Sequence, residues 1–89
     1  MSLVHHHLIT KYNYIMQTQL ETLARATEVV KELDYVFYSV GVRSYGEIAL
    51  QGRFNADLLK KLKEKGYTVE INSCGFIDGR KDDVAITLT

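Results

Sequence analysis

The chain has 89 residues, of which 46% are hydrophobic and 25% charged, as expected for one small globular domain. Eleven Lys and Arg balance eleven Asp and Glu, and each half of the chain is balanced too, which argues against nucleic-acid binding by bulk charge. The single cysteine excludes an internal disulfide, and no apolar run is long enough to cross a membrane, so we expect a cytoplasmic protein.

The N-terminal residues differ in character from the rest of the chain. We expect residues 1–15 to form an arm or leader, either natural or added by cloning, and residues 16–89 to form a single α+β domain. The arm contains three successive histidines, from His5 to His7. Neighbouring side chains of an extended segment point to opposite sides, and no acidic or sulfur ligand lies nearby in the sequence. The sequence therefore predicts no metal site there.

Two amphipathic helices are predicted, each with a recognisable start. The first spans about 18–33, where Thr18 begins a capping box and apolar residues recur at helical spacing. The second spans about 56–65, where Asn55 is a favourable N-cap and Gly66 a natural C-terminal stop.

Four strands are expected, two after each helix. The predicted ranges are 35–42, 47–53, 67–73 and 84–88. Residues 75–83 contain two glycines and three aspartates, which predicts a long turn. In the first strand, alternation predicts that Val36, Tyr38, Val40 and Val42 face the core.

The order α-β-β-α-β-β predicts an α+β fold in which two α-β-β units form a four-stranded antiparallel sheet with both helices on one face. The two halves share their core pattern: Ile48 corresponds to Val84 and Leu50 to Ile86. An alternative treats residues 3–9 as a first strand, which gives a ferredoxin-like βαββαβ fold with an extra strand.

No catalytic constellation is predicted. Residues 75–81 have the wrong spacing for a phosphate-binding loop, and a strand rather than a helix follows them. Asp78, Asp82 and Asp83 lack calcium-loop spacing. Cys74 has no base except the histidines of the arm. We therefore expect no enzymatic activity, no cofactor and no metal.

Two groups of residues are candidate binding sites. The aromatic residues Tyr35 and Phe37 are expected on the sheet face opposite the helices, with Tyr45 in the following turn, and exposed aromatics are typical of protein interfaces. The second group is basic and lies on or near the second helix, where it could contact phosphates: Arg53, Lys60, Lys61, Lys63 and Lys65.

These observations favour a small non-enzymatic binding or assembly module that acts through an exposed sheet face or edge. We expect a homodimer or another protein partner, because so small a core gains stability from association. The alternative is a nucleic-acid-binding regulator that uses the basic face of the second helix.

Overall fold

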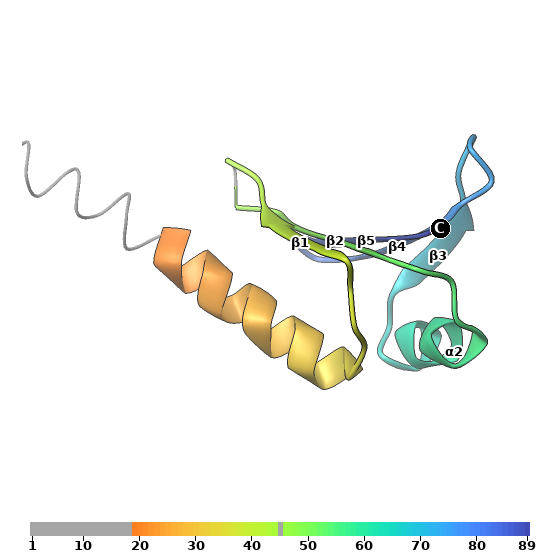
Figure 1. The fold of residues 1–89 in the computed structure, drawn as a ribbon, viewed down its shortest axis with the longest axis horizontal. Helices are drawn as coiled ribbons and strands as arrows, with labels where there is room; N and C mark the ends of the chain where they lie inside the picture. Colours follow the sequence, from red (N-terminus) through yellow and green to blue (C-terminus); the bar gives the residue numbers. More distant parts are fainter. Residues whose placement is uncertain (1–18, 45) are drawn as a thin grey trace, which may run out of the picture.

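The structure is a computed structural model that describes residues 19–44 and 46–89. Within them the chain forms two helices and a five-stranded mixed sheet (Figure 1). One helix covers residues 19–33, and the other, α2, spans Ala56–Glu64. The strands are β1 (Ser39–Val42), β2 (Ile48–Gly52), β3 (Thr68–Ile71), β4 (Ile77–Lys81) and β5 (Val84–Leu88).

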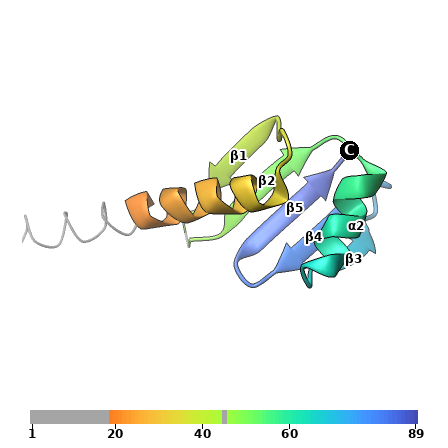
Figure 2. The same cartoon turned by 90° about the horizontal axis from the view of Figure 1, so that it is seen from below.

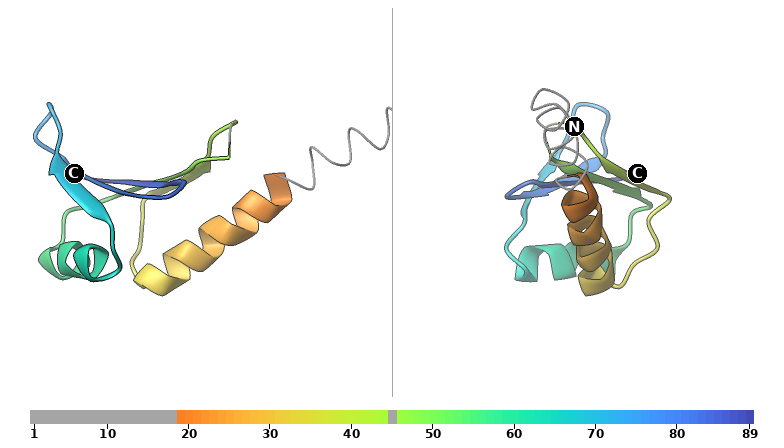
Figure 3. Two further views of the ribbon diagram at one scale, coloured as in Figure 1. Left: turned by 180° about the vertical axis from the view of Figure 1, so that it is seen from behind. Right: turned by 90° about the vertical axis from the view of Figure 1, so that its left-hand side faces the viewer.

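Both helices lie on the same face of the sheet (Figures 1 and 3). Seen from the helix side, α2 crosses the β3–β4 part of the sheet, and helix 19–33 crosses the other part (Figure 2). The core between these layers consists of apolar side chains from the helices and the two central strands: Ala26, Val29, Leu33, Ile48, Leu50, Leu58, Leu62, Val84, Ile86 and Leu88. Neither described helix has the length and apolarity needed to span a membrane.

The start of α2 agrees with the sequence prediction. Asn55 is the N-cap, and its Oδ1 accepts a hydrogen bond from the Leu58 N–H at 3.0 Å. Asp57 lies in the first turn, where a negative charge is favourable next to the helix dipole. At the other end, Lys81 donates from Nζ to the Lys65 carbonyl at 2.6 Å, so β4 also helps to close this helix.

The predicted four-stranded antiparallel sheet is wrong, because a fifth strand, β4, forms where a long turn was expected. Asp78 and Arg80 lie on the face without helices, but the helix-side positions are Ile77, Gly79 and Lys81, so the strand has no regular apolar alternation. On the helix side, Gly79 is buried, and a Cβ built there would lie 3.4 Å from Leu62 Cδ1. The strand thus uses glycine where a strand usually presents an apolar side chain, because α2 passes so close.

The sheet is also mixed rather than antiparallel. Its order is β1-β2-β5-β4-β3, and the central strands β2 and β5 are parallel. Parallel neighbours need a long crossover, which α2, β3 and β4 supply. In this register Ile48 lies beside Val84 and Leu50 beside Ile86, so the matching core positions of the two halves are direct neighbours. The ferredoxin-like alternative needed a strand over residues 3–9, which lie outside the described residues.

The predicted facing of residues 35–38 is wrong as well. Val36 is 90% exposed and Tyr38 58% exposed, whereas Tyr35 and Phe37 are half-buried against the core. The reason is that β1 begins only at Ser39. The Tyr38 N–H still donates to the Gln51 carbonyl at 2.9 Å, although Ser39 is the residue opposite Gln51. One extra residue is therefore accommodated there, as in a β-bulge, and it reverses the facing of the preceding side chains.

A candidate protein-binding edge and groove

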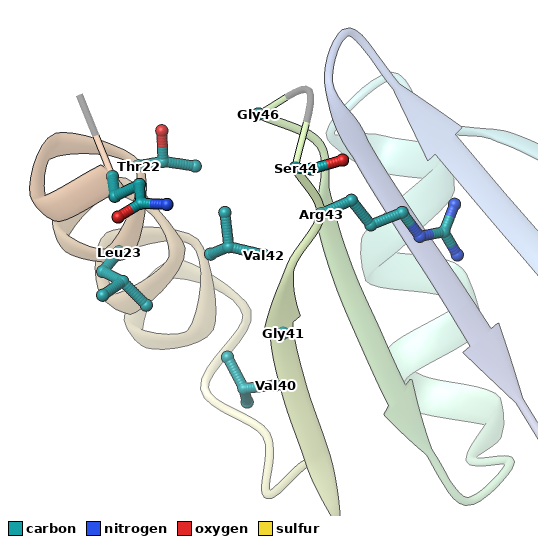
Figure 4. Close-up of a pocket in the computed structure, with 9 residues that line it drawn as sticks. Thr22, Leu23, Val40, Gly41, Val42, Arg43, Ser44 and Gly46 are labelled. Carbon is teal, nitrogen blue, oxygen red and sulfur yellow. The ribbon is translucent and has the colours of Figure 1, made fainter. Parts of the chain in front are cut away.

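A groove lies between the N-terminal half of helix 19–33 and strand β1 (Figure 4). It encloses about 340 Å3. Leu23 and Thr22 line the helix side of this groove, and Val40 and Val42 line the strand side. We call it the β1 groove; its other lining residues are Gln19, Gly41, Arg43, Ser44 and Gly46.

The groove lies where the N-terminal half of the helix extends past the end of the sheet (Figure 2). The C-terminal half of the helix is anchored through the buried residues Ala26, Val29 and Leu33, whereas Leu20 and Leu23 nearer its start are 61% and 50% exposed. Across the groove, Val40 is also 50% exposed. Apolar side chains on both walls are therefore incompletely covered by the described residues.

Strand β1 forms one edge of the sheet, and its hydrogen-bond pattern identifies the groups on the outer side. The Arg43 N–H donates to the Glu47 carbonyl at 2.8 Å, and the Ile48 N–H donates to Asp83 rather than to β1. Antiparallel pairs alternate between bonded and non-bonded, so Val42 and Val40 belong to the non-bonded type. Their N–H and C=O groups consequently point to the outer edge.

The outer edge of β1 carries no charge. Its sequence is Ser-Val-Gly-Val, without lysine or proline, two residues by which proteins commonly block strand addition. Arg43 follows the strand, but its side chain extends over the sheet, away from the helix (Figure 4). There its Nη1 lies 2.5 Å from Glu47 Oε1, and Arg80 Nη1 lies 3.9 Å from the other oxygen of that carboxylate.

The helix-free face of the sheet is polar and largely satisfied by its own contacts. Asp78 accepts hydrogen bonds from Thr87 Oγ1 at 3.0 Å and from Asn72 Nδ2 at 3.3 Å. The Oδ1 atom of Asn72 in turn accepts from the Cys74 and Phe76 N–H groups, which shapes the β3–β4 turn. No aromatic side chain of a described strand residue lies on this face.

Tyr35 and Phe37, which were expected on this face, lie on the helix side of the sheet instead. Tyr35 and Phe37 stack edge to face, with ring centroids 5.3 Å apart, and Tyr35 donates from its hydroxyl to the Arg53 carbonyl at 2.7 Å. Both rings cover Gly52, on the helix side of the sheet. Tyr45 lies outside the described residues. A role for these three residues in a protein interface stays a prediction.

The predicted basic group is only partly assembled. Arg53, Lys60, Lys63 and Lys65 are exposed. Lys61, in contrast, is half-buried and donates from Nζ to the Leu33 carbonyl at 2.8 Å. This ammonium group thus stabilises the end of helix 19–33, and nucleic-acid binding by the remaining four cations stays a prediction.

Among the described residues, no cluster of three or more His, Cys, Asp or Glu side chains could hold a metal ion. Cys74 is exposed in the β3–β4 turn, and the hydrogen bonds around it are made by backbone groups and Asn72. These hydrogen bonds place no base beside the Cys74 thiol, which a cysteine nucleophile would need.

Sequence reasoning missed the groove because Leu20 and Leu23 belong to the apolar stripe that predicts a buried helix face. No length comparison from the sequence could have found it, because the predicted strands 35–42 and 47–53 would span about 23–26 Å, as long as the helix. The lengths in the structure explain the groove. Residues 19–33 make a helix about 22 Å long, whereas a strand of four or five residues spans about 13–17 Å. The helix is therefore longer than the sheet that it covers, and one end of its apolar stripe extends beyond the core.

Comparisons with known proteins add no relationship: no family model, no curated protein and no solved structure matches this chain.

Proposed function

We propose that the protein is a non-enzymatic binding module that docks an extended segment of a partner polypeptide along the outer edge of β1. The observation that carries this proposal is that outward-pointing backbone groups and an incompletely covered apolar groove lie side by side at β1. The outward backbone groups of Val40 and Val42 lie directly beside the β1 groove, whose walls include the exposed side chains of Leu23 and Val40.

An added strand would satisfy both features at once. Its backbone would pair with the outward N–H and C=O groups of β1, as in other cases of strand addition. Alternate side chains of the segment would point to the helix side of the sheet and cover the groove. β1 carries no charge, and Arg43, the charged residue that lines the groove, extends away from the helix and pairs with Glu47. The favoured segment is therefore uncharged and has apolar residues at alternate positions.

Selection from a phage-displayed library of random twelve-residue peptides tests this function. We expect the selected peptides to show alternating apolar residues and to bind the Val42→Pro variant at least about tenfold more weakly. Proline at position 42 removes an N–H that points outward, so the β1–β2 hydrogen bonds remain. Val42→Thr keeps both the N–H and the side-chain shape, and it serves as the matched control.

Two results would count against the proposal. Peptides that bind Val42→Pro as well as the wild type would place the binding surface elsewhere. A library that yields no binder from repeated selections would remove the support for strand addition.

A further inference from the structure

We propose that the segment docking along β1 is the β1 strand of a second copy of this chain, antiparallel to it and with Gly41 opposite the partner's Gly41. This inference rests on the proposed function, because it identifies the partner of the same edge. It predicts a symmetric dimer in which two five-stranded sheets join into one.

The alternation of inward-pointing and outward-pointing backbone groups along β1 allows this register. Val40 and Val42 both direct their backbone groups outward, as derived above from the bonds of Arg43 and Ile48. In a two-fold arrangement centred on Gly41, Val40 lies opposite the partner's Val42. The two residues of such a pair can each donate an N–H···O=C hydrogen bond to the other. The two-fold axis generates the same pair a second time, between Val42 and the partner's Val40. A shift of the register by one residue would place a valine opposite the partner's Gly41. The backbone groups of Gly41 point to β2, so the hydrogen bonds between the two copies would be lost.

The side chains fit the same register. Val40 and Val42 lie on the helix side, because they pair with the buried residues Leu50 and Ile48. Across a two-fold axis they meet valines of the other copy, and the two β1 grooves come together. Leu23 of each copy then borders one shared apolar space, which buries surface that each copy alone leaves in water.

The opposite edge of the sheet is protected against the same arrangement. In β3, the Asn72 N–H donates to the Phe76 carbonyl, so by alternation Val69 and Ile71 carry the outward groups. A two-fold pairing of β3 would then place the exposed Glu70 directly opposite its own copy. Like charges directly opposite each other destabilise a strand pair. At the corresponding position β1 has Gly41, which has no side chain, so β1 is the edge suited to self-pairing.

Light scattering after size exclusion, over a range of protein concentrations, tests whether the dimer forms. The wild type and Val42→Thr are expected to dimerise, and Val42→Pro is expected to dissociate at concentrations about tenfold or more above those needed for the wild type. Circular dichroism establishes that each variant folds. A charge pair then tests the register: Gly41→Glu and Gly41→Lys should each weaken the dimer by about tenfold. A 1:1 mixture of these two variants should restore association as a heterodimer.

Position 41 is suited to this test because a Cβ there meets only the Ala49 carbonyl oxygen, at 3.8 Å. If the two charged variants do not complement each other, the register is wrong. A wild type that stays monomeric at every concentration while its selected peptides still depend on Val42 would overturn the self-pairing and leave the proposed function standing. A dimer and peptide binding that both survive Val42→Pro would overturn both proposals.

Discussion

At the scale of single residues, Gly52 is the position where the absence of a side chain matters most for packing. A Cβ at this position would lie 3.0 Å from Phe37 Cδ1 and 3.2 Å from Tyr35 Cε1. These rings pack on the backbone of β2 and connect helix 19–33 to the sheet. The glycine therefore allows the aromatic pair to close this side of the core.

Replacing Gly52 by alanine should lower the free energy of unfolding by about 1–3 kcal/mol, because the new methyl group forces both rings to move. Denaturant unfolding of the variant measures this loss. Gly41→Ala, measured at a protein concentration at which the chain is monomeric, is the matched control, since its methyl group meets no closer atom than the Ala49 carbonyl oxygen at 3.8 Å. That control should be neutral or up to about 1 kcal/mol more stable. Equal effects of the two substitutions would contradict the packing described for Gly52.

Tyr67 gives a residue-scale prediction that depends on pH. Burial raises the pKa of its phenol, and the nearby carboxylate of Glu32 acts in the same direction. Since the folded pKa exceeds the unfolded value near 10.0, the neutral phenol stabilises the fold below that pH. This contribution is lost as the pH rises through the folded pKa.

The ultraviolet absorbance of ionised tyrosine should therefore contain a late-titrating component, and Tyr67→Phe should remove it. The same substitution should also reduce the decline in stability above pH 10.0, measured by denaturant unfolding of the two proteins at each pH. An unchanged titration curve in the variant would mean that Tyr67 is not the shifted group.

At the scale of elements, Lys61 joins the two helices. Its ammonium group, on α2, donates to the Leu33 carbonyl at the end of helix 19–33, where the helix dipole favours a positive charge. We expect Lys61→Met to destabilise the protein by about 1 kcal/mol. Lys60→Met, on the exposed side of the same helix, should change stability by less than about 0.5 kcal/mol. Thermal unfolding of both variants provides the measurement, and a loss shared equally by them would argue against the Lys61 contact.

The elements also differ in how far they could be predicted from sequence. The start of α2 was predictable because its signals are local: Asn55 caps its first turn through the Leu58 N–H. Strand β4 was not, because Gly79 gives no apolar signal and its suitability depends on Leu62 from another element. The edge of β1 was partly predictable, since the valines alternate, but its start at Ser39 depends on where the connection from the helix ends.

At the scale of the whole molecule, the two central strands explain both the mixed sheet and its free edges. β2 and β5 carry the fully buried residues Ile48, Leu50 and Ile86, so they lie inside the sheet rather than at its edges. The sequence similarity of the two halves indicates matching core positions, but not whether those positions face each other across a parallel or an antiparallel pair. Their parallel pairing leaves β1 and β3 at the edges, with Gly41 at one and Glu70 at the other.

Amide hydrogen exchange, measured residue by residue by NMR, tests the central claim that the outer edge of β1 is the binding surface. The Val40 and Val42 N–H groups should become protected as the protein concentration rises into the range where it associates, because they then donate to the second copy. Fast exchange of both amides at every concentration, in a protein that nevertheless associates, would contradict the claim.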